Sequence, residues 1–436
     1  MNYCIKHTLM TYLGLFLFLN IFFIESASSQ FKNIKIDESR GTLGPCEPSI
    51  VIDPVNNNRI VAGSVLDRVH YSEDGGESWH NIVLESEYGV WGDPCVVADH
   101  LGNFYYFHLS NPDQKGWASE KLLDRMVCQK STDGGKTWNN GSYTGLNPPK
   151  DQDKEWAAVN HINNHLYLTW TQFDLYNSTA PGDSSNILFS ASTDLGESWN
   201  EPVRINQIAG NCLDDNHAVE GAVPTVGPNG EIYVAWSLEE KIYFDVSEDG
   251  GKTWLEHDRL VAEQKSGWNI NIPGIGRANG MPVTKCDISK GTFKGRIYVN
   301  YADQKEVGNN TDIWLTWSDD KGKTWSEPTR VNDDETEQHQ FFSWMDIDPV
   351  TGYVYIVFYD RRNFTDNQTE VFLAVSKDGG ETFENMKISE APFTPRTDVF
   401  FGDYNNISAF NGKVRPIWTQ TEGKTLSVWT AIIDFE

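Results

Sequence analysis

The sequence has few basic residues and little sign of helix. Thirty-five Lys and Arg residues stand against 62 Asp and Glu residues, which gives a formal net charge of −27 at pH 7. A field of this sign repels nucleic acid phosphates, so we expect no nucleic acid partner. No segment of useful length repeats its apolar residues with the period of a helix, and the chain is therefore expected to be all-β.

Cysteine is also scarce, with 6 residues in the chain. No CxxC pair and no Cys/His cluster with zinc spacing occurs, so we predict no metal ligands of that kind. If Cys4 is removed with an N-terminal leader, five cysteines stay, and an odd number allows at most two disulfides. We expect most of these residues to be buried free thiols.

Long apolar runs are limited to one, at residues 9–24. Its length of about 16 residues falls short of the roughly 20 that span a bilayer. Lys6 precedes the run and small residues follow it at 26–29, which is the pattern of a secretory signal peptide. We expect residues 1–29 to be cleaved, the protein to be secreted or periplasmic, and no integral membrane segment to follow. Nothing marks a boundary within 30–436, which we predict to be a single domain.

The chain does contain a repeat. One octapeptide occurs six times, as SEDGGESW, STDGGKTW, STDLGESW, SEDGGKTW, SDDKGKTW and SKDGGETF. Successive copies of its aspartate are 59, 61, 55, 71 and 58 residues apart, at Asp74, Asp133, Asp194, Asp249, Asp320 and Asp378. Each interval has room for four short strands and their turns. Asp, Gly and Ser/Thr favour a tight hairpin, so we interpret the octapeptide as a structural turn rather than a catalytic motif.

A second pattern lies upstream of each octapeptide and occurs once more after the last. It is an extended segment followed by a turn and an aromatic-rich strand, and the copies start near Glu47, Asp93, Glu155, Glu220, Gly280, Phe342 and Phe401. Seven such inner hairpins predict a seven-bladed β-propeller. The seventh repeat ends with a third strand at 426–433, while residues 31–36 form a strand without a blade. We predict that this N-terminal strand completes the last blade, since closure leaves no open sheet edge.

Each octapeptide resembles the Asp-box, S-x-D-x-G-x-[ST]-[WF], and over residues 45–430 the chain resembles the sialidase-like BNR repeat family that carries this motif. The resemblance implies a secreted β-propeller whose active site lies on the face opposite its six Asp-box hairpins. It also implies an arginine triad, a tyrosine nucleophile backed by a glutamate, and an aspartate acid/base, for release of terminal sialic acid. Here that implies Arg277 and Arg361 as triad members and Tyr301 with Glu220 as the nucleophile pair. The family's Arg-Ile-Pro motif is absent, because residues 44–48 read GPCEP. The number of blades also differs, since sialidases resemble six-bladed rings and this sequence has seven inner hairpins.

In a propeller, the residues before each first strand and after each second strand meet around the axis. Glycoside hydrolysis needs two acidic groups there, and clustered carboxylates raise one another's pKa. Glu220 and Asp303 are the predicted catalytic pair, with Asp93 and Glu155 next and Tyr301 as the candidate nucleophile. A structural alternative stays open, in which these carboxylates accept hydrogen bonds from inner strands or hold a cation such as calcium in the channel. We predict no cofactor.

Anionic sugars also require arginines, whose planar guanidinium meets a carboxylate or sulfate with two hydrogen bonds. The candidates are Arg277, Arg361 and Arg68, although Asp360 beside Arg361 leaves a simple ion pair open. The other predicted substrate-binding residues are His217, Trp156 and Tyr404. Histidine and tyrosine also permit β-elimination of uronate polysaccharides, for which His217, His339, Tyr301 and Tyr404 are the candidates.

These patterns together predict a secreted, monomeric, glycan-active enzyme of sialidase-like type. It would cleave glycosidic bonds of an anionic or complex polysaccharide through rim carboxylates, with arginines binding the substrate anion. Two alternatives stay open. One is a polysaccharide lyase on the same fold, and the other is a non-catalytic propeller that binds glycans or proteins.

Overall fold

The repeated hairpins fold into strands over most of the chain. The computed structural model describes residues 31–40, 44–304 and 310–435, and the predicted signal peptide lies outside them. The described residues form 28 strands and one short 3-10 helix, η1 (Gly116–Ala118). They are therefore all-β, as predicted.

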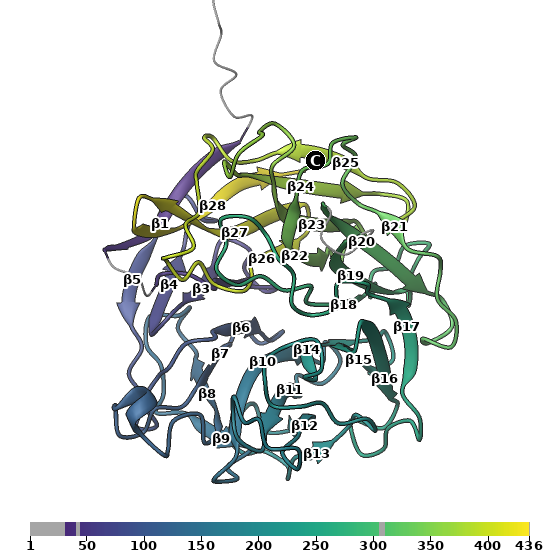
Figure 1. The fold of residues 1–436 in the computed structure, drawn as a ribbon. Coiled ribbons are helices and arrows are strands. Elements are labelled where there is room, and N and C mark those ends of the chain that lie inside the picture. The colour runs from purple at the N-terminus through teal and green to yellow at the C-terminus, as the bar shows by residue number, and fades with distance from the viewer. Residues whose placement is uncertain (1–30, 41–43, 305–309, 436) are drawn as a thin grey trace, which may run out of the picture.

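The strands form seven antiparallel sheets of four strands each, arranged as the blades of a propeller (Figure 1). Blades 1 to 3 contain β2 (Ser49–Ile52), β3 (Ile60–Ser64), β4 (Arg68–Ser72) and β5 (His80–Val83); β6 (Cys95–Ala98), β7 (Phe104–Leu109), β8 (Met126–Ser131) and β9 (Ser142–Thr144); and β10 (Asp151–Val159), β11 (Leu166–Phe173), β12 (Ser185–Ser192) and β13 (Val203–Arg204). Blades 4 and 5 contain β14 (Glu220–Val226), β15 (Ile232–Leu238), β16 (Lys241–Ser247) and β17 (Arg259–Glu263); and β18 (Val283–Cys286), β19 (Ile297–Gln304), β20 (Thr311–Ser318) and β21 (Thr329–Arg330). Blades 6 and 7 contain β22 (Gln340–Ile347), β23 (Val354–Asp360), β24 (Glu370–Ser376) and β25 (Glu384–Lys387); and β26 (Asn406–Phe410), β27 (Lys413–Glu422), β28 (Thr425–Asp434) and β1 (Lys32–Arg40).

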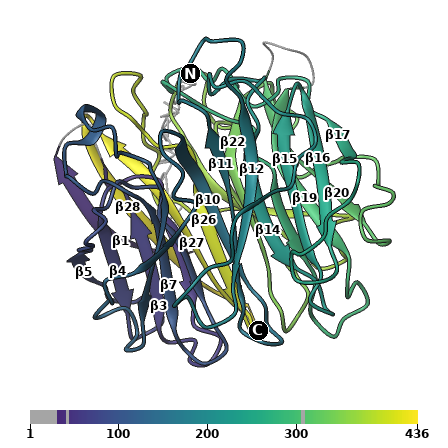
Figure 2. The same ribbon diagram turned by 90° about the horizontal axis from the view of Figure 1, so that it is seen from below.

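The second strands of the blades are the most deeply buried. Every residue of β7, β15 and β23 is buried, and these strands are rich in Val, Ile, Phe, Tyr and Trp. Such residues suit a strand that is covered on both faces. Figure 2 shows the blades from the side, with their strands running between the two faces of the ring. The hydrophobic core therefore lies between adjacent blades.

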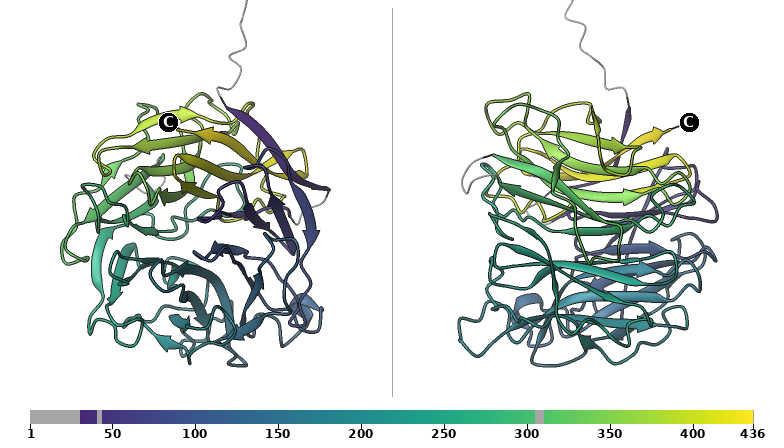
Figure 3. Two further views of the ribbon diagram at one scale, coloured as in Figure 1. Left: turned by 180° about the vertical axis from the view of Figure 1, so that it is seen from behind. Right: turned by 90° about the vertical axis from the view of Figure 1, so that its right-hand side faces the viewer.

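The N-terminal strand closes the ring, as predicted. β1 pairs antiparallel with β28 from Lys32 opposite Ile432 to Arg40 opposite Thr425, with one irregularity between Lys35 and Asp37. Figure 3 shows β1, in purple, beside the yellow strands of blade 7. The side chain of Asn81, from blade 1, donates to the Ile36 carbonyl at 2.9 Å. The first and last segments of the ring are thereby joined.

Each Asp-box is a hydrogen-bonded turn between the third and fourth strands of a blade. In the fourth blade, the Asp249 carboxylate accepts from the Ser247 hydroxyl at 2.9 Å, the Thr253 amide at 2.9 Å and the Thr253 hydroxyl at 2.7 Å. The bonds from Thr253, with that from Ser247, lower the pKa of Asp249 to about 2. The Asp-box aspartates thus serve the turn, as the sequence predicted.

The last aromatic residue of an Asp-box packs against the preceding blade. The ring of Trp254 meets that of Phe189 edge-on, with 5.0 Å between centroids, and Trp325 meets Phe244 in the same way at 5.2 Å. Gly251 makes this packing feasible, because a Cβ there would lie 2.0 Å from the Phe189 ring and its φ is +86°. The Asp-box therefore joins neighbouring blades as well as turning the chain.

The first strands surround an axial cavity of about 250 Å³. Most of its lining residues have apolar side chains, and Lys285 and Asp346 form an ion pair of 3.1 Å within it. The Asp-boxes and the turns between first and second strands lie at one end of the blades. The connections between second and third strands, and those between blades, lie at the other end, which we call the mouth.

The cysteines of the described residues are all buried free thiols, at Cys46, Cys95, Cys128, Cys212 and Cys286. This agrees with the expectation from their number and spacing. Burial raises the pKa of Cys95 to about 12, so this thiol is inert at neutral pH. Within the described ranges, we find no helix that is long and apolar enough to cross a bilayer.

Candidate active site

The residues that enter the first strands at the mouth have unusual backbone conformations. Glu47, Asp93, Lys154 and Phe342 have positive φ angles of 50°, 48°, 57° and 49°. Each stands two residues before a side chain that lines the axial cavity. A non-glycine residue in this conformation costs ~1–3 kcal/mol, and such strain concentrates at functional sites. The same conformation recurs in four blades, and this directs attention to the mouth.

A buried ionic network crosses the ring at the mouth. Asp403, which precedes β26, accepts from Lys154 Nζ at 2.8 Å and from Arg277 Nε at 2.9 Å, with a further contact from Arg277 Nη2. Lys154 Nζ also lies 3.9 Å from Asp93 Oδ2. The side chains of Lys154 and Asp403 are 4% and 1% exposed, so solvent screens this pairing little. The network joins blades 2, 3 and 7 to the connection between β17 and β18.

The network drives the pKa values of neighbouring carboxyl groups apart. Burial opposes ionisation of Asp403, but Arg277 and Lys154 outweigh burial and lower its pKa to about 2. Glu47 Oε1 accepts from the Asp403 amide at 3.1 Å, and burial together with Asp93 and Asp403 raises the pKa of Glu47 well above its usual value. Burial also raises the pKa of Asp93. The mouth therefore holds an ionised carboxylate beside carboxyl groups whose pKa values are raised, an arrangement suited to acid–base chemistry.

Glu155 and Glu220 add two more buried carboxyl groups. Among the described residues, neither has a hydrogen-bond partner for its side-chain oxygens. Burial raises the pKa of both well above the usual value, with Asp93 adding to the effect at Glu155 and Asp214 at Glu220. Asp153 lies in the same environment, and its pKa rises to about 7 through burial. Buried carboxyl groups without partners cost stability, which makes them functional candidates.

Arg277 is the part of the network that solvent reaches, because its side chain is 40% exposed. Arg277 Nη1 donates to Asp214 Oδ2 at 3.0 Å. The Tyr176 hydroxyl donates to the same oxygen and Trp268 Nε1 donates to the other, each at 3.0 Å. The guanidinium is therefore held in one place by two carboxylates, on a side chain that solvent reaches in part.

Arg277 is carried by residues 264–282, which we call the crossing segment because it passes over the middle of the ring (Figure 1). The Ser266 amide and hydroxyl donate to Asp303 at 2.8 and 2.6 Å. Arg361 Nη1 donates to the Pro273 carbonyl at 2.6 Å. Six apolar side chains of the segment are buried, at Trp268, Ile270, Ile272, Ile275, Ala278 and Met281. The segment is therefore a packed part of the fold that fixes Arg277 over the mouth.

An aromatic cluster separates the network from the axial cavity. The ring of Trp156 lies 4.3 Å from that of Trp344 and 4.9 Å from that of Tyr404, measured between centroids. Trp156 and Trp344 line the cavity, whereas Tyr404 and Asp403 line a small void on the other side. The cluster keeps the base of the network apolar, which accounts for the raised pKa values above it.

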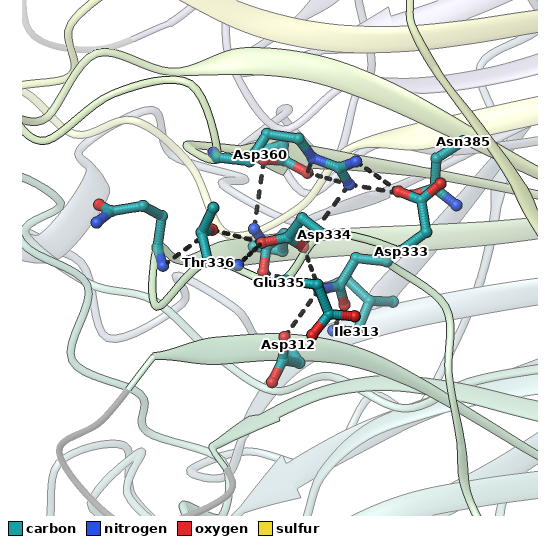
Figure 4. Close-up of polar contacts among 12 residues, drawn as sticks. Asp312, Ile313, Asp333, Asp334, Glu335, Thr336, Asp360 and Asn385 are labelled. Carbon is teal, nitrogen blue, oxygen red and sulfur yellow. Dashed lines mark hydrogen bonds and ion pairs between the residues drawn. The ribbon is translucent and has the colours of Figure 1, made fainter.

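A second polar network lies on blades 5 and 6 (Figure 4). Arg362 donates to Asp360 at 2.8 Å and to Asp333 at 2.5 Å, and Asn332 links further aspartates beside them. Asp360 therefore pairs with Arg362, so the ion pair with Arg361 that the sequence left open is not the one formed. The side chains of this network form hydrogen bonds and ion pairs with one another, and we therefore interpret the network as structural.

The mouth brings together six of the residues predicted from the sequence: Asp93, Glu155, Glu220, Arg277, Trp156 and Tyr404. The other five are not part of the ionic network or the aromatic cluster. Asp303 and Arg361 hold the crossing segment. Tyr301 is buried in the core between blades 4 and 5. Arg68 lies 3.7 Å from Asp37 of the closing strand, and His217 is exposed, 4.0 Å from Glu239.

Lys154, Asp153 and Asp214 belong to the network but were not predicted. Lys154 had a signal in the sequence, because it occupies the same place in its repeat as Glu47 and Asp93, two positions ahead of a cavity-lining residue. Asp214 had none, since it lies in a connection outside the repeat. In the described part of the chain, no group of three or more His, Cys, Asp or Glu side chains could hold a metal ion. The positive charge of the network comes from Lys154 and Arg277.

Comparison with known proteins agrees with the predicted BNR repeat propeller. Residues 186–407 match the family model of the BNR repeat-like domain. An ulvan lyase of polysaccharide lyase family 25 is 13% identical with a TM-score of 0.56, over 92% of this chain and 96% of that chain. A protein of unknown function from Dyadobacter fermentans is 13% identical with a TM-score of 0.51, over 91% and 100%. A Hadza microbial sialidase, Hz136, is 13% identical with a TM-score of 0.49, over 86% and 73%. At these identities the similarity shows the fold alone.

Proposed function

The chain belongs to the BNR repeat-like domain family, and from this premise we propose that it is a secreted enzyme that hydrolyses glycosidic bonds of an anionic polysaccharide. The observation that carries the proposal is the split in pKa values beneath an exposed arginine. Asp403 is ionised at neutral pH, whereas the pKa values of Glu47 and Asp93 are raised. Hydrolysis of a glycosidic bond uses one carboxyl group as proton donor and an ionised one as nucleophile or base.

Each member of the network has a role in this proposal. Asp93 donates the proton to the leaving oxygen, since its side chain is 15% exposed and its pKa is raised. Asp403 is the ionised partner, and Lys154 and Arg277 keep it ionised. Arg277, whose side chain is 40% exposed, binds the substrate's carboxylate or sulfate, with which a guanidinium can form two parallel hydrogen bonds.

One observation supports an anionic polysaccharide as substrate, and another favours hydrolysis over elimination. A solved ulvan lyase that shares this fold carries a bound chain of glucuronate and sulfated rhamnose. Of the residues that elimination would use, Tyr404 lies at the mouth beside Trp156. The others are apart from the network, with His217 exposed beside Glu239, Tyr301 in the core, and His339 accepting from the Thr311 amide at 3.2 Å. The carboxyl groups, by contrast, converge on Lys154 and Arg277.

Chromatography of products after incubation with sialylated, uronate-containing and sulfated glycans tests the proposal. With the glycan that is cleaved, Asp93→Asn should lower turnover by about 100-fold or more, the usual loss of a general acid. Asp245→Asn is the matched control. Asp245 is also buried with a pKa raised to about 7, but it lies in β16, so this variant should keep wild-type turnover. An unsaturated uronate product would assign elimination instead, and binding without any product would assign the non-catalytic alternative.

A further inference from the structure

A stacked aromatic pair, one ring exposed and the other half-buried, lies at the mouth, on the connections between second and third strands of blades 2 and 3. Trp117, in η1, is 67% exposed. Its ring stacks on Tyr176 with 5.9 Å between centroids and an interplanar angle of 24°. Trp91 meets the Trp117 ring edge-on at 6.2 Å. The indole of Trp117 is therefore presented to solvent, supported by the half-buried ring of Tyr176.

The pair is rigid because both of its members are supported from below. Gly116 lies directly on Trp91, since a Cβ at that position would be 2.6 Å from the indole, and its φ is +53°. The Gly116 amide donates to Asn111 Oδ1 at 3.1 Å. Phe173 packs edge-on against Tyr176 at 5.2 Å. An aromatic group that is already fixed loses little conformational entropy when a ligand binds.

The pair is connected to the ionic network by one carboxylate. The Tyr176 hydroxyl and Arg277 Nη1 both donate to Asp214 Oδ2, each at 3.0 Å. Two hydrogen bonds therefore separate the stacked rings from the exposed guanidinium. A ligand that bound Arg277 and extended toward blades 2 and 3 would reach Trp117.

We propose that Trp117 and Tyr176 form a subsite that stacks one sugar ring of a polysaccharide, so that the protein binds an extended chain rather than a single terminal sugar. The C–H faces of a pyranose ring are weakly positive and apolar, and they fit the negative face of an indole. Asp214 and Arg277 supply the polar contacts that sugar hydroxyls need beside such a face. This inference rests on the proposed function for its substrate class, but it concerns binding and not cleavage.

Calorimetric titration of the full chain with polygalacturonate and chondroitin sulfate oligosaccharides tests the subsite. Wild-type protein should bind chains of eight sugar units more tightly than chains of two. Trp117→Ala should raise the Kd for the long chains about 3- to 10-fold and reduce the difference in Kd between long and short chains. Trp117→Phe keeps an aromatic ring, so its Kd for the long chains should rise less. Leu101→Ala is the control, because it removes an exposed large apolar side chain on the Asp-box face and should bind as wild type does.

The results separate this inference from the proposed function. A chain-length effect that Trp117→Ala removes supports the subsite even if no glycan in the panel is cleaved. Failure of the wild type to bind either length, or an equal loss for both lengths, would overturn the subsite even if cleavage occurs. Sedimentation with phosphatidylcholine vesicles that depends on Trp117, with unchanged oligosaccharide binding, would assign the aromatic pair to membranes and also overturn the subsite.

Discussion

Asp153→Asn should flatten the pH dependence of stability between pH 4 and 7. Asp153 is buried, and burial raises its pKa to about 7 although Lys154 opposes the shift. In the unfolded chain its pKa is about 3.9. A carboxyl group whose folded pKa lies above its unfolded pKa binds more protons when folded. Its contribution is therefore largest below pH 4 and is lost as the pH rises toward 7.

The expected size follows from the difference in pKa. About three units at 1.36 kcal/mol for each unit give a loss of about 4 kcal/mol between pH 4 and 7. Asparagine does not titrate, and its Oδ1 can still accept the 3.0 Å hydrogen bond that the Lys154 amide donates to Asp153. The variant should therefore keep the local structure and lose the titration. The fall in stability below pH 4 should stay, because Asp403, with its pKa lowered to about 2, loses its contribution there.

Urea unfolding at intervals of pH measures this directly. The difference in unfolding free energy between wild type and Asp153→Asn should change by about 4 kcal/mol across the interval. Glu335→Gln is the control, since the Glu335 side chain is 95% exposed, and its curve should follow the wild type. If the curves of unfolding free energy against pH are parallel for wild type and Asp153→Asn, the claim that folding raises the pKa of Asp153 is refuted.

Two further changes test the packing and charge of the fold. Lys154→Met leaves the ionised Asp403 with only Arg277 as a cation, and should cost about 3–5 kcal/mol in urea unfolding. Adding Asp403→Asn should restore part of that loss, and no recovery would contradict the pairing. Gly251→Ala places a Cβ 2.0 Å from the Phe189 ring at positive φ, and should cost about 2–4 kcal/mol in thermal unfolding. Gly182→Ala, where a Cβ meets nothing within 4 Å, should change stability by less than about 1 kcal/mol.

The fold could be predicted because its signals are local and repeated. Each Asp-box carries its own turn chemistry in eight residues, so six copies marked six blades without any knowledge of long-range contacts. The seventh blade and the closing strand followed from counting, since the strand at 31–36 and the unfinished repeat at 426–433 each needed a partner. The packing of Trp254 on the preceding blade was not predictable, because it depends on how two blades meet.

The candidate site could be predicted only where it follows the repeat. Asp93 precedes the first strand of its blade, Glu155 lies in the first strand of the next, and the structure brings both to the mouth. Asp303 lies at the end of a second strand, yet its carboxylate is taken up by Ser266 of the crossing segment. Nothing in the repeat indicates where that segment runs, because it lies outside the repeated pattern. The contacts of Asp303 and Asp214 are therefore set by tertiary structure.

The closing strand makes the integrity of the ring depend on the two most distant parts of the described chain. Lys32 pairs with Ile432, about 400 positions later in the sequence. Removal of β1 would leave the other six blades with their four strands but would free the edge of β28. An unpaired edge is a template for association with another chain. Damage near the N-terminus would therefore produce self-association of an otherwise folded molecule.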